Sequence, residues 1–332
     1  MASIAHIGYG YWGKNIARNF AELGLLAAIV DPNPASAEAG AKAHHVRAAS
    51  FEEVLADSTI DGISIAAPAE LHFKLASAAL KAGKHVFVEK PLTIDVGEAE
   101  ALCEMADKAG LTLMVGHLLQ YHPVYVKLRE MVAAGELGKL QYVYSNRQSL
   151  GKFRREENVL WSFAPHDISM ILGLVGEEPH HVSAQGCVAY TPGVADMVTM
   201  QMQFPGGVAG HVQTCWMHPF KEQKLVAIGD KASAVFEDSL ADWDRKLLLY
   251  PHRMDVGGPV PIPTKADAVP VAVAKSEPLK AECQHFADCI DGKTSARTDG
   301  AEGTRVLRAL DKAEKALSEN LKLQAAAGRK AA

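Results

Sequence analysis

Several features are scarce in this chain, and each scarcity excludes a class of protein. Only five cysteines are scattered through 332 residues, without a C-x-x-C pair, so neither a disulfide framework nor a zinc site is indicated. No apolar run reaches the roughly 18 residues of a membrane-spanning helix, and no basic leader or apolar signal core precedes the first predicted strand. We therefore expect a cytoplasmic protein that makes no contact with a membrane.

Positive charge is also in short supply. Lys and Arg number 34 against 39 Asp and Glu, which gives a formal net charge of −5 and no general attraction to nucleic acid. No cluster of metal ligands is visible in the sequence. A hydrophobic content of 48% with 22% charged residues is typical of a globular protein, and the length favours two domains of ordinary size.

A glycine pattern stands out close to the amino terminus. The stretch Gly8-Tyr9-Gly10-Tyr11-Trp12-Gly13 follows the apolar run 4–7 and precedes a predicted helix over residues 14–23. Gly8 allows a sharp turn after a strand, Gly10 lets the backbone approach a pyrophosphate, and Gly13 lets the helix pack on the sheet. The amino end of that helix presents N–H groups to phosphates. The pattern predicts a dinucleotide site.

A carboxylate after the second apolar run indicates which dinucleotide is bound. The run 25–30 ends at Asp31, which follows Gly13 by 18 residues. A carboxylate at this place accepts hydrogen bonds from both ribose hydroxyls of the adenosine and repels a 2′-phosphate. No arginine follows it directly, because the text continues Asp-Pro-Asn-Pro. The sequence therefore favours NAD over NADP.

The first third of the chain alternates between strands and helices. Further strands are predicted at 60–66, 85–88 and 112–115, with helices at 71–82 and 97–109 between them. Strands that are apolar throughout and alternate with helices imply a parallel sheet covered on both faces. We expect a doubly wound dinucleotide-binding domain over residues 1–120.

The remaining residues, 121–332, have a different pattern. Residues 197–204 alternate between polar and apolar side chains and precede a Pro-Gly-Gly turn, which is typical of an antiparallel sheet. We expect a mostly antiparallel α/β domain with an open sheet, an irregular surface segment at 251–278, and closing helices at 278–290 and 301–320 that pack back on the first domain. The apolar side chains of 197–204 suggest that two such sheets pair in a homodimer or homotetramer.

Short motifs after the parallel strands give the chain a family resemblance. Ala66-Ala67-Pro68 and Leu71-His72 follow the third strand, Glu89-Lys90-Pro91 the fourth, and Gly116-His117 the fifth. In this order the chain resembles the Gfo/Idh/MocA family of NAD(P)-dependent oxidoreductases, which implies a Rossmann domain followed by a domain with an open sheet. The resemblance implies that Lys90 lies near the nicotinamide and the reacting sugar carbon. The expected cofactor-binding residues are Gly8, Gly10, Tyr11, Trp12, Gly13, Asp31, Ala67, Pro68, His72, Glu89, Lys90 and His117.

The same family carries a histidine at the start of a helix in its second domain, usually four residues after an aspartate. His166 matches the histidine, whereas Ser162 stands at the aspartate position. A serine hydroxyl cannot raise the pKa of the histidine by charge, so either Asp167 takes part or Lys90 and His166 share the proton transfer without an aspartate. We predict Lys90 and His166 as catalytic residues and leave open which of them is the base. A capping or buried structural role for His166 is the alternative.

Cations cluster just before this histidine. Lys152 and three arginines precede the segment 158–166, and guanidinium groups are well shaped for phosphate oxygens. A solvated charged loop, partly neutralised by Glu156 and Glu157, is the other interpretation. The expected substrate-binding residues are Lys90, Arg147, Arg154, Arg155, Asn158, Trp161, His166 and Asp167.

Within the family, the Gly-Tyr-Trp-Gly text, residues 158–167 and residues 216–221 look most like members that act on nucleotide-linked sugars. The resemblance implies NAD-dependent oxidation of the C3 hydroxyl of UDP-N-acetylglucosamine to a 3-keto sugar for a partner aminotransferase, in lipopolysaccharide or lipid A biosynthesis. Oxidation or reduction of a free sugar or polyol such as inositol is one alternative. A non-catalytic NAD-binding regulator is another, since Ser162 replaces the family aspartate.

Overall fold

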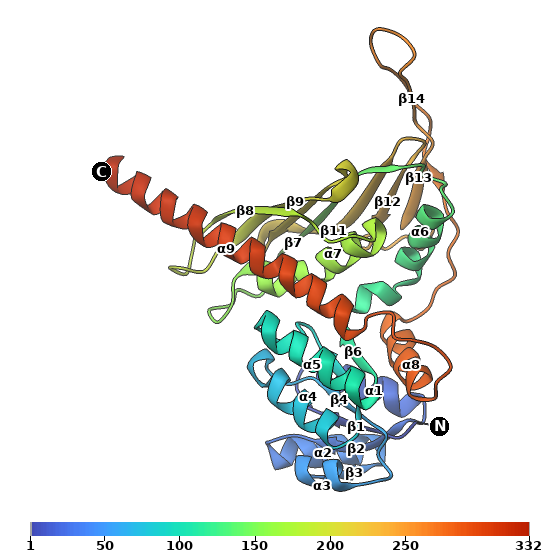
Figure 1. Ribbon diagram of the computed structural model, residues 1–332, viewed down its shortest axis with the longest axis vertical. Helices are drawn as coiled ribbons and strands as arrows, with labels where there is room; N and C mark the ends of the chain where they lie inside the picture. The colour runs from blue at the N-terminus through green and yellow to red at the C-terminus, as the bar shows by residue number, and fades with distance from the viewer. Residues whose placement is uncertain (1, 332) are drawn as a thin grey trace. The chain divides into compact units, whose positions relative to one another are not determined.

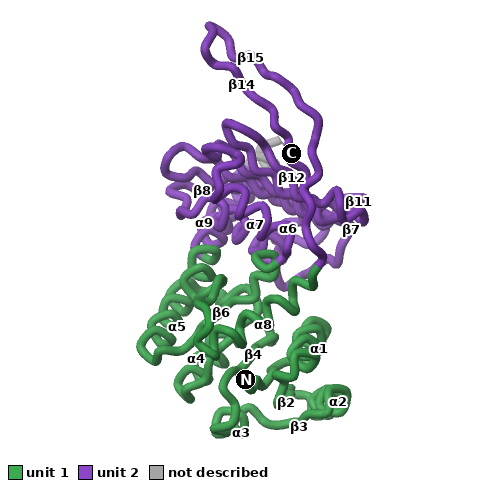
Figure 2. Tube along the Cα trace, turned by 90° about the vertical axis from the view of Figure 1, so that its right-hand side faces the viewer, with its two compact units in different colours: residues 1–121, 276–307 green, residues 122–275, 308–332 purple. Residues whose placement is uncertain are grey.

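The computed structural model describes residues 2–331, with side chains described up to residue 326 (Figure 1). It divides into two compact units, shown in different colours in Figure 2. The first unit comprises Met1–Tyr121 and Ser276–Leu307, and the second comprises His122–Lys275 and Arg308–Ala332. Each unit is therefore built from two separate stretches of the chain, and the segment Ser276–Leu307 belongs to the same unit as the glycine pattern.

The first unit contains a six-stranded sheet in the order β3-β2-β1-β4-β5-β6, in which every neighbouring pair is parallel. This is the strand order of a Rossmann domain, so the predicted doubly wound sheet is confirmed. The strands are β1 (Ile4–Ile7), β2 (Leu26–Val30), β3 (Arg47–Ala48), β4 (Gly62–Ile65), β5 (His85–Glu89) and β6 (Leu113–Gly116).

Helices cover both faces of this sheet, with α4 and α5 on one side and α1 on the other (Figure 2). The rings of Phe20, Phe87 and Phe286, from α1, β5 and α8, pack together in the core on the α1 side. The helices of this unit are α1 (Gly13–Glu22), α2 (Pro34–His44), α3 (Phe51–Ala56), α4 (His72–Lys81), α5 (Val96–Ala109), α8 (Pro278–Ile290) and the first residues of α9 (Gly300–Ala331).

Two of these helices, α2 and α3, were not predicted, although both carry start signals. Asn33 caps α2 and is followed by Pro34 at the first helical position. Ser50 and Glu53 form a capping box at α3. Apolar residues are few in both segments, so the caps are the more informative signal there.

The second unit contains an eight-stranded sheet in the order β16-β13-β12-β11-β7-β10-β9-β8. Neighbouring strands are antiparallel except β7 and β10, so the predicted mostly antiparallel sheet is confirmed. The strands are β7 (Leu140–Leu150), β8 (His181–Cys187), β9 (Met197–Gln203), β10 (Ala209–Cys215), β11 (Met217–Gly229), β12 (Ser233–Glu237), β13 (Leu247–Tyr250) and β16 (Val269–Pro270).

Helix α7 (Val159–Val175) packs on one face of this sheet, next to α6 (Pro123–Ala133). Gly210 of β10 shows the packing, because the position of a Cβ there lies 3.2 Å from Met202 and 3.3 Å from Ile171 of α7. The apolar side chains of β9 are therefore buried beneath α7, while Gln201 and Gln203 are exposed on the other face. This corrects the expectation that the apolar side of β9 is free to pair with a second sheet.

Two other expectations are corrected by local structure. The segment 251–278 contains a hairpin of β14 (Arg253–Asp255) and β15 (Ile262–Thr264), which extends away from the sheet of its own unit (Figure 1). Helix α9 continues to Ala331 instead of ending at residue 320. Its later part packs on the second sheet, since Leu317 lies against Gly186 of β8.

Candidate active site

The glycine turn at the carboxyl end of β1 requires two of its glycines for steric reasons. Gly8 has a positive φ of 92°, and a Cβ there would lie 2.4 Å from the carbonyl oxygen of Ala66. A Cβ on Gly13 would lie 1.8 Å from the carbonyl oxygen of Gly8. At Gly10 no atom comes within 4 Å of such a position, and no side chain caps the start of α1. The open space and the free helix start fit a pyrophosphate.

A buried histidine supports this turn from below. The ring of His6 lies 3.1 Å from Ser64 Oγ through Nδ1 and 3.1 Å from the Gly8 carbonyl oxygen through Nε2. Burial lowers the pKa of His6 to about 4, so the ring is neutral near pH 7. His6 is not among the site residues predicted from the sequence. The available signal was a polar side chain inside an otherwise apolar buried strand.

Asp31, directly after β2, is held by backbone N–H groups. Its Oδ2 accepts a hydrogen bond of 2.7 Å from Tyr9 N–H, and its Oδ1 accepts one of 2.8 Å from Asn33 N–H. The carboxylate is therefore fixed to the glycine turn itself. A carboxylate oxygen has two lone pairs, so each oxygen still has one to offer a ribose hydroxyl.

The side chain of Trp12 connects the glycine turn to the end of β5. Its indole N–H donates to Glu89 Oε1 at 2.5 Å, and the adjoining Tyr11 is 94% exposed. Burial raises the pKa of Glu89. Lys90 follows directly and is partly buried, and its own N–H donates to Glu89 Oε2 at 3.2 Å. Trp12 and Glu89, both predicted to bind the cofactor, are therefore hydrogen-bonded to one another at the carboxyl end of β5.

His72 and His117 are both buried, which changes the role expected for them. His72 is 1% exposed, and its two ring nitrogens lie 2.7 Å from the Pro91 carbonyl oxygen and 2.9 Å from that of Ala67. It thus joins the ends of β4 and β5 and positions the segment that carries Lys90. His117 is also 1% exposed and bonds Glu302 of α9 at 2.5 Å. Both histidines therefore support the site through these hydrogen bonds, and their contact with the cofactor stays a prediction.

Glu282 of α8 is a third buried carboxyl group near Glu89 and Glu302. It is fully buried, and among the described residues neither of its oxygens has a hydrogen-bond partner. Burial, followed by the charges of Glu89 and Glu302, raises its pKa well above the usual value. Nothing in the sequence near residue 282 signals its place beside the strand ends.

In the second unit, His166 lies in the interior of α7 rather than at its start, because the helix begins seven residues earlier at Val159. Asn158 caps the helix by accepting hydrogen bonds from the N–H groups of Leu160 and Trp161. Its amide and the Trp161 indole both donate to Glu314 Oε2, at 2.8 and 3.0 Å. Ser162 is buried one turn before His166.

A cavity of about 530 Å³ lies beside these residues in the second unit. Its walls include Asn158 and Glu314 from the helix layer, and Val188 and Gly193 from the connection between β8 and β9. The amides of Asn158 and Gln324 and the carboxylate of Glu314 along its walls suit a polar ligand. Asn158, which the sequence predicts to bind the substrate, thus both lines this cavity and caps α7.

Arg147 and Asp167 form a buried pair beneath α7. Arg147 Nε lies 2.5 Å from Asp167 Oδ2, and Ser145 Oγ donates to Asp167 Oδ1 at 2.5 Å. The Asp167 side chain is 1% exposed and that of Arg147 is 13% exposed. The pair therefore anchors α7 on β7, and the contact of Arg147 and Asp167 with the substrate stays a prediction. Asp167 is engaged by Arg147 and Ser145, and its part in the proton transfer stays open as well.

The other cations of the cluster lie on an exposed loop between β7 and α7. Lys152, Arg154 and Arg155 are all exposed, and Arg154 pairs with Glu157 at 2.9 Å. An exposed pair of this kind contributes little to stability. Positive charges of this kind suit the oxygens of a phosphate, and Arg147 differs from the other three cations in being mostly buried and paired with Asp167.

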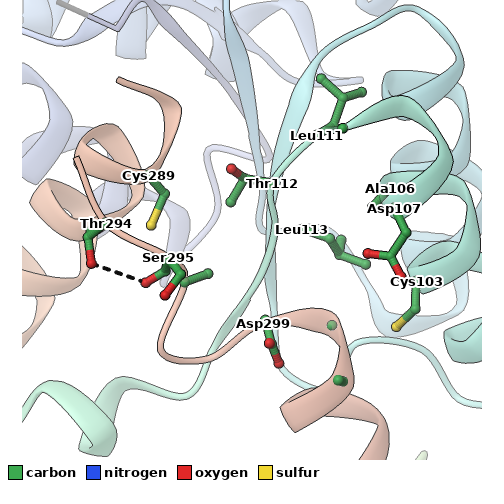
Figure 3. A pocket seen from close by; sticks show the side chains of 14 residues that line it. Cys103, Ala106, Asp107, Leu111, Thr112, Leu113, Cys289, Thr294, Ser295 and Asp299 are labelled. Carbon is green, nitrogen blue, oxygen red and sulfur yellow. Dashed lines mark hydrogen bonds between the residues drawn. The ribbon is translucent and has the colours of Figure 1, made fainter. Parts of the chain in front are cut away.

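A further cavity of about 300 Å³ lies in the first unit, between α5, the start of β6 and the turn that joins α8 to α9 (Figure 3). Leu113, at the beginning of β6, forms part of its wall, together with Cys103 and Cys289. In a parallel sheet, cofactors bind beyond the carboxyl ends of the strands. This cavity lies at the amino end of β6 and is therefore separate from the glycine turn.

Neither a metal site nor a membrane-spanning helix is found in the described part of the chain. No group of three His, Cys, Asp or Glu side chains among these residues is arranged to hold a metal ion. Across the same residues, no helix combines the length and the apolar character needed to cross a bilayer.

Comparisons with known proteins agree with this geometry. Residues 2–117 match a family model described as an oxidoreductase family with an NAD-binding Rossmann fold, and residues 125–235 match the GFO/IDH/MocA C-terminal domain. The chain is 33% identical over 308 residues to a UDP-N-acetylglucosamine 3-dehydrogenase of Acidithiobacillus ferrooxidans, covering 91% of this chain and 93% of that protein.

Two further similarities extend over most of the chain. A scyllo-inositol 2-dehydrogenase (NAD(+)) of Bacillus subtilis is 26% identical, covering 89% of this chain and 87% of that protein. A solved structure of the A. ferrooxidans UDP-N-acetylglucosamine 3-dehydrogenase superposes with a TM-score of 0.84 at 29% identity, covering 96% of this chain and 98% of that one.

Proposed function

The chain belongs to the Gfo/Idh/MocA family of NAD-dependent oxidoreductases, and from this premise we propose that it oxidises the C3 hydroxyl of a UDP-N-acetylhexosamine to a ketone. UDP-N-acetylglucosamine is the substrate that we put first. The observation that carries the proposal is the exposed basic loop, where Lys152, Arg154 and Arg155 stand within four residues just before α7. A free polyol has no charge that would require such a loop, whereas a diphosphate does.

The residues that would hold the cofactor are those around the glycine turn. The amino end of α1 and the space at Gly10 suit the pyrophosphate, and Asp31 suits the adenosine ribose. When bound, NAD accepts the hydride that leaves the sugar carbon. Trp12 and Glu89 hold the turn and the end of β5 together, so the positions of these groups are set before the cofactor arrives.

Oxidation of the alcohol also requires that the hydroxyl proton be removed. We assign this proton to the neutral imidazole of His166, which has a lone pair to accept it. We assign to the Lys90 ammonium the stabilisation of the negative charge that develops on the oxygen. The hydride and the proton together account for the two hydrogens lost, and the carbon–oxygen bond becomes a carbonyl. His72 positions the Lys90 segment by bonding the Pro91 carbonyl oxygen.

The experiment is a single-turnover reaction of the protein with excess UDP-N-acetylglucosamine and limiting NAD, with the sugar product identified by mass spectrometry. We expect formation of NADH together with a product that is lighter by two hydrogens and carries its ketone at C3. A single turnover is needed because a 3-keto product is energetically unfavourable and stays bound with NADH. Tight NAD binding without oxidation of any UDP-hexosamine would overturn the proposal.

Oxidation of a free polyol is the second candidate, and the similarity to a scyllo-inositol 2-dehydrogenase favours it. The two functions differ in their need for the basic loop. If removal of the Arg154 and Arg155 side chains leaves the turnover of inositol unchanged and no nucleotide sugar is oxidised, the polyol function is the correct one.

We also propose that the protein works as a homodimer or homotetramer and hands its 3-keto product to an aminotransferase. The open face of the second sheet carries Tyr142 and Tyr144, whose rings lie 5.7 Å apart, and these are candidates for burial by a second copy. Light scattering tests the assembly, and a monomer would contradict it. Formation of an amino sugar in a coupled reaction with an aminotransferase tests the product.

A further inference from the structure

Two aromatic rings lie open to solvent at one end of the second sheet. Phe153, in the loop after β7, is 40% exposed, and Tyr190, in the connection between β8 and β9, is 68% exposed. Their rings meet edge to face, with centroids 5.1 Å apart and an interplanar angle of 85°. Phe153 also rests on Trp216, whose ring centroid lies 5.7 Å away. We call Phe153 and Tyr190 the aromatic platform.

The platform stands on a rigid, buried base. Trp216 is fully buried, and its indole N–H donates to Asp196 Oδ1 at 2.6 Å. Asp196 is 1% exposed, and its Oδ2 accepts hydrogen bonds from the N–H groups of Ala189 and Tyr190, at 2.7 and 3.0 Å. The Trp216 carbonyl oxygen accepts one from Gly151 N–H at 3.0 Å. One buried carboxylate thus fixes the backbone of Tyr190 and the support of Phe153.

Such an arrangement suits a flat ligand. Exposed aromatic rings are unfavourable in water unless something covers them, and these two are held in place rather than folded into the core. A nucleobase stacks on aromatic side chains, and this interaction is insensitive to which base is present. An aromatic side chain also loses little conformational freedom when a ligand binds, because it has only two rotatable bonds.

Charge identifies the kind of ligand more closely. Lys152 and Arg154 are the sequence neighbours of Phe153, and Arg155 follows, so the platform adjoins three exposed cations. An apolar segment of a partner protein would gain nothing from these charges. A base linked to a diphosphate matches both features, since the base covers a ring and the phosphates meet guanidinium groups.

The platform also adjoins the helix that carries the predicted base. The position of a Cβ on Gly151 lies 3.7 Å from Phe163 Cζ and 3.8 Å from Trp216 Cβ. Phe163 precedes His166 by three residues in α7, which is about one helical turn, or roughly 5 Å along the axis. The loop that holds Phe153 therefore touches α7 next to His166.

We propose that the aromatic platform is the base-stacking subsite for the uracil of the nucleotide sugar, with Lys152, Arg154 and Arg155 at its diphosphate. The inference rests on the proposed function, and it adds the residues that recognise the nucleotide. Phe153 and Tyr190 are specificity-determining residues in this view, and Asp196 and Trp216 position them. The platform selects for a nucleotide over a bare sugar phosphate or a polyol.

The test measures the affinity of the full-length protein for UDP and for inorganic pyrophosphate by calorimetry. Phe153→Ala and Tyr190→Ala are each expected to weaken UDP binding by about tenfold and to leave pyrophosphate binding unchanged. Tyr190→Phe keeps a ring and should restore UDP affinity. Phe220→Ala is the matched control, because Phe220 is 62% exposed but pairs with His218 outside the platform. NAD affinity should be unchanged in all four variants.

The possible outcomes separate this inference from the proposed function. If the wild-type protein oxidises UDP-N-acetylglucosamine but the alanine variants bind UDP as it does, the platform is not the base subsite and the proposed function stands. If the variants instead change the oligomeric mass in light scattering with UDP affinity intact, a second copy covers the rings and the inference fails. If the wild type binds pyrophosphate but not UDP, both are overturned.

Discussion

The glycine turn of the first unit and the basic loop of the second unit are held in opposite ways. Around the turn, His6 is buried and Asp31 bonds two backbone N–H groups, so the groups that face a dinucleotide are fixed in advance. In the basic loop, Lys152, Arg154 and Arg155 are exposed, and Arg154 forms an ion pair with a near neighbour, Glu157. The comparison shows that the groups around the cofactor turn are held by buried and backbone contacts, whereas the cations of the basic loop are exposed and held by few contacts.

The largest effect is expected at Lys90. This residue directly follows β5 in the first unit, and we propose that it takes part in the reaction itself. Lys90→Met should lower the rate of NADH formation by about 10³-fold, because the charge that stabilises the developing alkoxide is lost. Isothermal titration should show NAD affinity unchanged. Lys81→Met removes an exposed lysine of α4 and serves as the control. If Lys90→Met kept the full rate, Lys90 would have no part in the chemical step, and the first unit would serve only to bind the cofactor.

The next effect concerns the buried support of the turn and its dependence on pH. The pKa of His6 is about 4 in the folded protein against an ordinary value of 6.5. Between these values the unfolded chain binds a proton that the folded protein does not, so stability falls as the pH drops from 6.5 to 4. The contribution of His6 to this loss is about 3 kcal/mol.

Urea unfolding of the wild type and of His6→Gln at pH 7 and at pH 4.5 measures this effect. The stability difference between the two proteins should shrink at the lower pH, because glutamine does not titrate. An unchanged difference would mean that the pKa of His6 is the same in the folded and the unfolded protein. His6 would then not be the buried, neutral support of the glycine turn described above.

A smaller effect is expected for the carboxylate that faces the ribose. Asp31→Ala should weaken NAD binding by about 2 kcal/mol, or roughly 30-fold, since hydrogen bonds to a charged group are lost together with the anchor on Tyr9 N–H. Asp31→Asn keeps an acceptor at one position and should lose less. Fluorescence titration with NAD measures both variants, and equal affinities for all three proteins would show that the carboxylate does not face the cofactor.

The smallest effect is expected in the exposed loop. Arg154→Ala should weaken UDP binding by about 1 kcal/mol or less at low salt, because an exposed charge is well solvated before the ligand arrives. The effect should fade at 1 M salt, where charges are screened within about 3 Å. Arg253→Ala removes an exposed arginine of the β14 hairpin and is the control. A loss that persists in high salt would mean that the loop is as rigid as the glycine turn.

Sequence patterns predicted the elements whose signals are local. Gly8 and Gly13 stand where a Cβ would collide with backbone, and the alternation of apolar runs with helices gives the parallel sheet directly. The bonds that hold the site together join residues far apart in the chain. His6 and Ser64 are 58 positions apart, and His117 and Glu302 are 185 apart, so neither pair has a sequence signal.

The same difficulty applies to predicted site residues whose tertiary contacts the sequence did not reveal. In the sequence, Arg147 cannot be distinguished from the other cations that precede α7. Only the fold shows that it pairs with Asp167, twenty positions away. His72 follows a strand, where ligand contacts are common. Its buried ring is hydrogen-bonded to two backbone carbonyl groups, which the sequence does not reveal. Burial and pairing depend on tertiary contacts, which patterns of one strand or helix do not contain.

The attachment of Asp31 to the backbone of Tyr9 has an evolutionary consequence. A mutation that made room for a 2′-phosphate by removing this carboxylate would also remove one of the hydrogen bonds on the turn that faces the pyrophosphate. One side chain thus serves the ribose and the turn at once, so a change of cofactor preference made at this position would also disturb the neighbouring phosphate site.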